Sequence, residues 1–155
     1  AEEKQRILTE VETSVNAGMR EIASEAVGEH RKSPRLSLGD TSYKFEVFED
    51  TGTGTAFFGL VLFDMAVFRA TDLPAIAHDS VLFKNISNDS VAHLVALYAN
   101  NQKQSFIALD EIQKYGAAAA LILNEQSVIQ LSDQAVLYIK DWRPNRSPAP
   151  VDDAD

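Results

Sequence analysis

Apolar residues recur every three or four positions through the first 28 residues of the chain. This spacing predicts an amphipathic helical arm over residues 1–28, with one apolar stripe and charged residues elsewhere. The stripe consists of Ile7, Leu8, Val11, Val15, Met19, Ile22, Ala23 and Ala26. Gly28 and Pro34 indicate where the helix stops. The pattern suits two interpretations, a helix packed on its own domain or the returning arm of a coiled coil.

Beyond a basic loop, strand-like runs alternate with helical ones. Residues 43–48 alternate with period two and predict a half-exposed strand, whereas residues 56–69 are apolar nearly all round, which is typical of a buried helix. Residues 73–77 and 105–109 are apolar runs that end in acidic residues, as buried parallel strands do. Caps near Ser87 predict a helix between these two strands.

The C-terminal part contributes weaker signals. A helix near residues 117–124 and strands at residues 128–131 and 136–139 complete the expected elements. The alternation predicts an α/β fold with a largely parallel sheet and flanking helices over residues 36–142. Residues 143–155 are rich in proline and aspartate, which predicts a disordered acidic tail.

Composition narrows the class of protein. With 155 residues, 45% of them hydrophobic, the chain suits one domain. It contains no cysteine, which excludes a disulfide scaffold, a Cys-ligated zinc site, an iron–sulfur cluster and a thiol nucleophile. The 14 Lys and Arg residues against 23 Asp and Glu residues give a net charge of −9, so we expect no direct nucleic-acid contact.

The N-terminus lacks the apolar core of a signal peptide, and the chain opens in a charged helical pattern, as a piece of a longer protein would. The most apolar run, residues 56–70, is interrupted by Asp64 and Arg69 and is expected to be too short to span a membrane. We therefore expect a cytoplasmic protein without membrane contact.

A polar glycine loop opens directly into the expected buried helix. Its residues are Asp50, Thr51, Gly52, Thr53, Gly54 and Thr55. Backbone N–H groups at a helix start, with glycines that permit close approach, form a phosphate or anion site. A capped helix after a tight turn is the structural alternative. The chain contains no Gly-x-x-x-x-Gly-Lys-Ser/Thr sequence, so the loop is not a P-loop.

Acidic residues end the two expected parallel strands. Asp79 ends the first strand, where an Asp commonly holds Mg²⁺, and Asp110 and Glu111 end the second. If the strands are neighbours, Asp79 and Asp110 lie close enough to share a metal. The alternative role of Asp79 is a helix N-cap or turn residue.

Two further signals favour a structural interpretation. His78, Asp79 and Ser80 have the residue types of a catalytic triad, but adjacent strand residues point to opposite faces, so no local triad is expected. Asp64, inside the apolar helix, is expected to be a hydrogen-bonded polar residue where helices cross.

The order of these pieces resembles the C-terminal lobe of ATPase heads in the SMC and RecN branch of the ABC superfamily. The resemblance covers about residues 1–131. More narrowly, the chain resembles an uncharacterised bacterial family, the domain-of-unknown-function family 2326, found at the C-terminal end of SMC-like ATPases. The motifs that carry this resemblance are DTGTGT (50–55), LFD (62–64), HDSVLFKNI (78–86) and FIALD (106–110).

The resemblance implies a role for each matching segment. Residues 51–54 correspond to the ABC signature loop, which reaches across a dimer to the γ-phosphate of the partner's ATP. Asp79 corresponds to the Walker B aspartate, which orients Mg²⁺, and residues 83–85 fall where the D-loop crosses the dimer interface. The lobe would thus complete a Mg-ATP site in a homodimer of heads, in a protein of DNA maintenance or phage defence.

Three positions depart from the superfamily pattern. The signature loop reads Thr-Gly-Thr-Gly, Ser80 stands where a Glu positions the attacking water, and Leu109 stands where the switch histidine is expected. A serine cannot serve as a carboxylate base at neutral pH, although Asp110 or Glu111 could substitute. The P-loop would come from an N-terminal ATPase lobe, so the isolated chain is not expected to turn over ATP.

Two other function classes stay open. A stand-alone Mg-dependent hydrolase or nuclease would use Asp79, Asp110 and Glu111 and would be active without a partner lobe. A non-catalytic assembly module would use the glycine loop and Asp79 structurally. In that case an Asp79→Ala substitution would change stability but no nucleotide readout.

Overall fold

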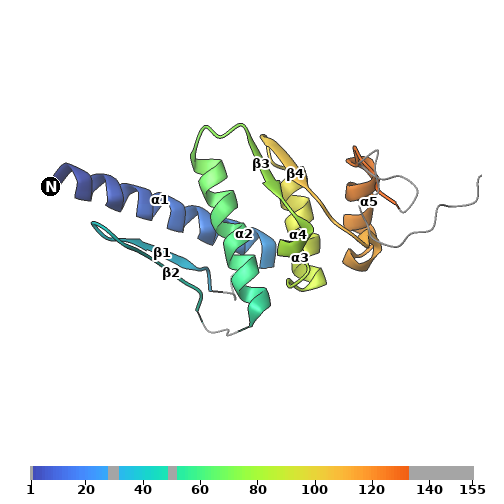
Figure 1. The fold of residues 1–155 in the computed structure, drawn as a ribbon, viewed down its shortest axis with the longest axis horizontal. Helices are drawn as coiled ribbons and strands as arrows, with labels where there is room; N and C mark the ends of the chain where they lie inside the picture. The colour runs from blue at the N-terminus through green and yellow to red at the C-terminus, as the bar shows by residue number, and fades with distance from the viewer. Residues whose placement is uncertain (1, 28–31, 49–51, 133–155) are drawn as a thin grey trace, which may run out of the picture. The chain divides into compact units, whose positions relative to one another are not determined.

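The computed structural model describes residues 2–27, 32–48 and 52–132. The chain divides into two units, residues 1–125 and residues 126–155. The helices and strands of the described residues all belong to the first unit (Figure 1). In the second unit, residues 126–132 form no helix or strand, so the strand predicted at 128–131 is wrong. The strand predicted at 136–139 and the tail predicted at 143–155 lie outside the described residues.

The N-terminal arm is one long helix, α1 (Glu2–Val27), as the apolar spacing predicts. The C-terminal half of its stripe is buried in the core and consists of Val15, Met19, Ile22, Ala23 and Ala26. In the N-terminal half, Ile7 is 47% exposed and Val11 is 45% exposed. The C-terminal half of the helix therefore packs on its own domain, as the first interpretation of the stripe expects. The apolar residues of the N-terminal half are exposed, which is compatible with the coiled-coil interpretation.

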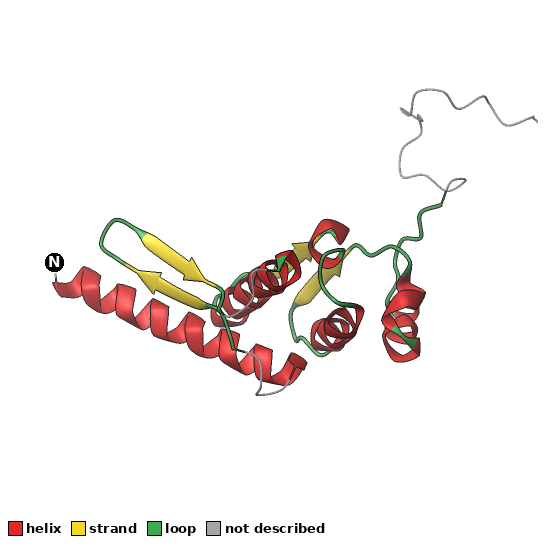
Figure 2. Cartoon of the chain, turned by 90° about the horizontal axis from the view of Figure 1, so that it is seen from below, coloured by secondary structure: helices red, strands yellow, loops and turns green. Residues whose placement is uncertain are grey.

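Two short strands, β1 (Arg35–Leu38) and β2 (Tyr43–Glu46), form an antiparallel hairpin beside α1 (Figure 2). The amide of Asn16 on α1 donates to the carbonyl of Leu36 at 2.7 Å and accepts the Leu36 N–H at 2.8 Å. A polar side chain of α1 thus pairs with backbone groups of Leu36 on the outer edge of β1. The sequence pattern does not predict β1, because four residues that lie against helix side chains leave no clear alternation.

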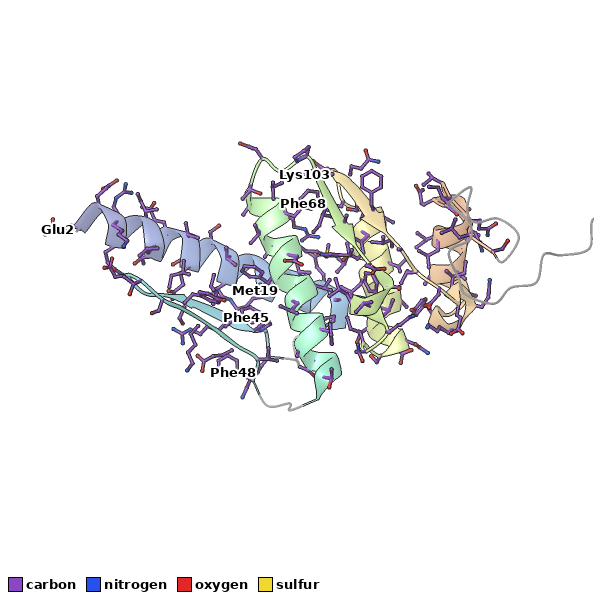
Figure 3. All side chains as sticks on the ribbon, viewed as in Figure 1. Glu2, Met19, Phe45, Phe48, Phe68 and Lys103 are labelled. Carbon is purple, nitrogen blue, oxygen red and sulfur yellow. The ribbon has the colours of Figure 1, made fainter. Side chains whose placement is uncertain are left out.

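Helix α2 (Thr53–Ala70) crosses α1 and supplies much of the core (Figures 1 and 3). At the crossing, a Cβ on Gly18 would lie 3.2 Å from the Cβ of Ala66, so a small residue is needed there. At the C-terminal end of α2, the Lys103 ammonium donates to the carbonyls of Phe68, at 2.6 Å, and of Thr71. A cation at this end also favours the helix dipole.

By length and composition alone, α2 is long and apolar enough to cross a membrane. Its 18 residues rise about 27 Å, so the expectation that this segment is too short is wrong. Its apolar character is explained by packing, since Phe58, Leu62 and Met65 are buried in the core that α2 shares with α1. The core role follows from these contacts and not from the length of the helix.

The remaining elements begin with a strand–helix–strand unit. It consists of β3 (Ala75–His78), the short helix α3 (Ser80–Phe83), α4 (Asn88–Ala99) and β4 (Gln104–Ile107). Strands β3 and β4 pair in parallel, with Ala75 opposite Gln104 and His78 opposite Ile107. The 3-10 helix η1 (Ile112–Tyr115) and α5 (Ala117–Glu125) follow, and both pack against α4.

The fold contains helices and strands as predicted, but its sheets differ from the expectation. The described strands form two separate two-stranded sheets, β1–β2 antiparallel and β3–β4 parallel. The prediction of one largely parallel sheet is therefore not confirmed. Asn16 and Glu12 of α1 bond to the outer edge of β1, so among the described strands this one pairs only with β2. The domain boundaries at residues 28, 36 and 142 stay predictions.

Candidate functional site

The glycine loop leads into the first turn of α2. Gly52, which has no side chain, is the N-cap, in extended conformation. By contrast, the side chains of Asp79 and Ser87 cap α3 and α4. Thr53, the first residue of α2, is exposed, and Thr51 lies outside the described residues. The positive end of an 18-residue helix dipole therefore begins at the loop that the sequence singles out as an anion site.

Gly54 packs against the loop that follows α3. A Cβ at Gly54 would lie less than 3.0 Å from the carbonyl oxygen of Asn85 and 3.9 Å from the Cα of Ile86. Only glycine allows this backbone approach. The structure thus brings together the signature-like segment and the D-loop-like segment at residues 83–85. No local signal in the sequence shows this contact, because it joins residues far apart in the chain.

Asp79 directly follows β3, and its side chain is exposed. Its Oδ1 accepts the N–H of Ser80 at 2.6 Å, so Asp79 is the N-cap of α3. The structural role considered for this residue is therefore confirmed, although the helix that it caps was not predicted. Within the described residues, the second oxygen, Oδ2, has no hydrogen-bond partner. A capping role and a metal role are thus compatible at this residue.

Asp110 and Glu111 follow the end of β4 by three and four residues, and β4 pairs with β3. This neighbouring arrangement is what a metal shared between Asp79 and Asp110 would require. However, Asp110 is paired with lysines: its Oδ2 lies 3.0 Å from Lys84 Nζ and its Oδ1 lies 3.6 Å from Lys114 Nζ. The hydrogen bond with Lys84 lowers the pKa of the Asp110 carboxyl below its ordinary value. Glu111, at φ 47°, lies 3.4 Å from the same Lys114.

These pairings bear on the metal hydrolase alternative. In the part of the chain that the structure describes, no three His, Asp or Glu side chains gather as a protein metal site would need. Asp79, Asp110 and Glu111 accordingly do not form such a cluster, and lysines occupy the carboxylate oxygens of Asp110. The arrangement gives no support to a stand-alone metal hydrolase.

His78, which the sequence analysis assigns to no triad, is buried and bonds to a buried tyrosine and to Asp64, whose side chain is 44% exposed. It is 7% exposed, and its Nδ1 is hydrogen-bonded to the hydroxyl of Tyr98 on α4. Its Nε2 lies 3.1 Å from Oδ2 of Asp64 on α2. Asp64 is thus a hydrogen-bonded polar residue, as expected, but its partner lies on β3 and not at a helix crossing. A histidine in an otherwise apolar strand is the signal that could have indicated this group.

A groove of about 700 Å³ lies elsewhere, between the polar face of α1 and the hairpin. Residues of α1 from Glu12 to Ser24, residues 32–35 and Phe48 line it (Figure 3 labels Phe48). None of the candidate site residues named from the sequence is among the residues that line this groove. The candidate site is therefore defined by the α2 start and the end of β3, and not by a hollow.

The oxygen donors near Asp79 suit a magnesium–nucleotide complex. In such complexes Mg²⁺ takes one or two carboxylates, with phosphate oxygens and waters as the other ligands. Asp79 Oδ2 and the Ser80 hydroxyl are donors of this kind, and a third carboxylate is not needed. The start of α2 carries first-turn backbone N–H groups and the positive end of the helix dipole, which favour phosphate. The residues present therefore fit Mg-ATP.

The chain is similar in fold to a solved structure described as "Structural biochemistry of ATP-driven dimerization and DNA stimulated activation of SMC ATPases". The TM-score is 0.52 at 13% sequence identity, and the match covers 66% of this chain and 70% of that chain. At this identity the likeness concerns the fold alone.

The sequence family is more specific. A family model described as "Uncharacterised protein conserved in bacteria (DUF2326)" matches residues 19–140. The chain belongs to this family, which confirms the resemblance carried by its four motifs. A search of curated proteins gives no match.

Proposed function

We propose that this chain is the C-terminal lobe of an SMC/RecN-like ATPase head, which completes a Mg-ATP site and drives ATP-dependent head dimerisation. The observation that carries the proposal is the packing of Gly54, in the first turn of α2, on Asn85 in the loop just beyond Asp79 and α3. The SMC-like fold supports the same assignment. The two segments that such a site requires thus lie against each other in this chain.

In this proposal the start of α2 binds the γ-phosphate of the ATP held by the partner head. The first-turn N–H groups, the helix dipole and the exposed Thr53 hydroxyl all favour an anion at this position. Glycine at position 54 lets the turn lie close to the D-loop-like segment, so that both segments would meet the partner together. The signature-like loop would act across the dimer.

Asp79 would act within its own head. With Oδ1 held by the Ser80 N–H, the carboxylate has a fixed orientation, and Oδ2 would hold Mg²⁺ or a water bound to it. Ser80 would add a hydroxyl but no general base. Asp110 and Glu111, which could replace the missing base, are paired with Lys84 and Lys114. We therefore propose that nucleotide binding and dimerisation, more than fast hydrolysis, are the main output.

The open surfaces of the lobe fit this role. Alternate residues of β3 and β4, including Ala75, Ala77 and Phe106, are exposed, and Phe106 is 50% exposed. Each strand also has one edge that no described strand pairs with. An N-terminal ATPase lobe that supplies the P-loop would cover this apolar face and extend the sheet. The exposed Ile7 and Val11 of α1 would face the other strand of a coiled coil.

The substitution Thr53→Asp tests the proposal in the full-length protein. An acidic residue in the first turn of a helix is stabilising by about 0.3–1 kcal/mol, so the lobe should fold at least as well as wild type. The same charge would repel the γ-phosphate of the partner's ATP. We expect Mg·ATP-driven dimerisation, measured by sedimentation velocity, to weaken by about 100-fold, while the thermal midpoint of the lobe is unchanged or higher.

Thr53→Ser is the matched control, because it keeps the hydroxyl and should dimerise as wild type does. If Thr53→Asp dimerises with Mg·ATP as tightly as wild type, the start of α2 does not meet a phosphate and the proposal is wrong. A wild-type protein that binds no ATP at all would instead favour the non-catalytic assembly module.

A further inference from the structure

The polar group around His78 connects three elements beneath the candidate site. Tyr98 comes from α4, His78 from the last position of β3, and Asp64 from the middle of α2. The carboxylate of Asp64 can only accept, so the Nε2–H of His78 donates to it at 3.1 Å, and Nδ1 is left to accept the Tyr98 hydroxyl proton. Burial raises the pKa of Tyr98, with a smaller contribution from the charge of Asp64, so this hydroxyl keeps its proton.

Aromatic packing adds a fourth contact to this group. The ring of Phe83, at the end of α3, lies edge-on to His78 at 6.4 Å and to Tyr98 at 6.2 Å, measured between ring centres. Phe83 is 1% exposed. The residue that begins the D-loop-like segment is therefore packed on the same histidine that precedes Asp79. Pairs of this geometry favour one relative orientation of the rings.

The direction of the side chains explains what this group can do. Successive residues of a strand point to opposite faces, and here His78 is buried while Asp79 is exposed. Fixing both ring nitrogens of His78 therefore fixes the strand end from which Asp79 projects. An apolar residue at position 78 would fill the same space but would not fix the position of the strand end. Hydrogen bonds at both ring nitrogens of His78 specify one arrangement of the strand relative to α2 and α4.

We propose that Tyr98, His78 and Asp64 position Asp79 and its Mg²⁺ relative to the glycine loop at the start of α2. The inference rests on the proposed function, because it assigns positioning residues to that same site. Asp64 belongs to the helix that carries the loop, His78 to the strand that carries Asp79, and Tyr98 ties that strand to α4. None of the three would touch the nucleotide.

The first test uses this chain and needs no nucleotide. Tyr98→Phe removes the hydroxyl and keeps the ring, so the core stays filled while Nδ1 of His78 loses its donor. We expect hydrogen exchange of the Ser80 N–H, which bonds to Asp79, to rise about tenfold relative to the Val91 N–H in α4. Tyr115→Phe, the same change at a buried tyrosine outside the group, should leave this ratio unchanged.

The second test uses the full-length protein and titrates Mg²⁺ at saturating ATP. The Mg²⁺ concentration at half-maximal dimerisation should rise about tenfold in Tyr98→Phe and in Asp64→Ala. Asp64→Asn keeps an oxygen that accepts from Nε2–H and should restore most of the wild-type value. If Tyr98→Phe lowers stability but changes neither the Ser80 exchange ratio nor the Mg²⁺ midpoint, the group is structural only and the inference is overturned.

The two proposals can fail separately. If the wild-type protein does not respond to Mg·ATP, the composite ATP site is ruled out, and with it the role of this group toward Mg²⁺. If the wild-type protein dimerises with Mg·ATP and Tyr98→Phe behaves identically, only the positioning role is ruled out.

Discussion

Asp79→Asn in the full-length protein is expected to reduce Mg·ATP-driven dimerisation and any ATP turnover by at least about 100-fold, with no loss of folding. Metal-ion stabilisation is worth several kcal/mol, and about 1.4 kcal/mol corresponds to one factor of ten. Asparagine caps a helix about as well as aspartate, so the bond to the Ser80 N–H can be kept. The substitution therefore removes the charge that Mg²⁺ needs and leaves the structural role.

The measurement is Mg²⁺-dependent dimerisation by sedimentation velocity, beside thermal unfolding of the same samples. Asp79→Ala serves as the comparison, because it should lose the metal role and also about 1 kcal/mol of stability from the lost cap. Equal behaviour of Asp79→Asn and wild type toward Mg·ATP would show that Asp79 is a cap and nothing more. That result would favour an assembly module.

Gly54→Ala is expected to lower the free energy of unfolding of this chain by about 1–3 kcal/mol, the usual cost of overpacking a close contact. The new methyl group would lie less than 3.0 Å from the carbonyl oxygen of Asn85, and that atom is backbone, which cannot rotate away. The loop after α3 or the first turn of α2 must then shift. Because both segments belong to the candidate site, Mg·ATP-driven dimerisation should fall as well.

Gly59→Ala is the matched control in the same helix. Its Cβ would meet Val47 at 3.4 Å, an ordinary contact, and alanine is favoured over glycine within a helix by about 0.5–1 kcal/mol. Urea unfolding should therefore show opposite signs for the two substitutions. If Gly54→Ala is as stable as Gly59→Ala, the close approach of the α2 start to Asn85 is not present in solution.

The long helices could be predicted from the sequence because each carries its own periodic signal. The stripe of α1 and the apolar length of α2 are local patterns, and a helix forms where they occur. The 3.6-residue period also indicates which face of a helix is apolar, but not what covers that face. The sequence therefore gave no sign that Asn16 of α1 bonds to the edge of β1.

The short elements were harder to predict. Strands of four residues provide too few positions to establish a period, so β1 was not predicted, and the predicted ends of β3 and β4 differ from the observed ones by one or two residues. The parallel orientation of β3 and β4 follows from strand–helix–strand order, which the sequence does show. The strand expected at 128–131 has the right residue types, but no helix or strand forms there.

Within the candidate site, the sequence indicated the residue types and the structure gave their partners. The resemblance assigns Gly54, Asp79 and residues 83–85 roles at a composite ATP site and its dimer interface, and the Gly54–Asn85 contact is compatible with these roles. The pairing of Asp110 with Lys84 could not be predicted, because the two residues approach only once β3 and β4 are side by side. The bonds of His78 have the same origin, since their partners come from α2 and α4.

The most direct test of the account is complementation between two inactive full-length variants. In a composite dimer, Thr53→Asp damages the site on the partner head, whereas Asp79→Asn damages the site on its own head. A mixed dimer of the two variants then has one site with both defects and one site with neither. The account predicts that mixing them restores Mg·ATP-driven dimerisation, which is weakened about 100-fold in each variant alone. No recovery on mixing, with both variants folded and the wild type active, would contradict a site shared between two copies of this lobe.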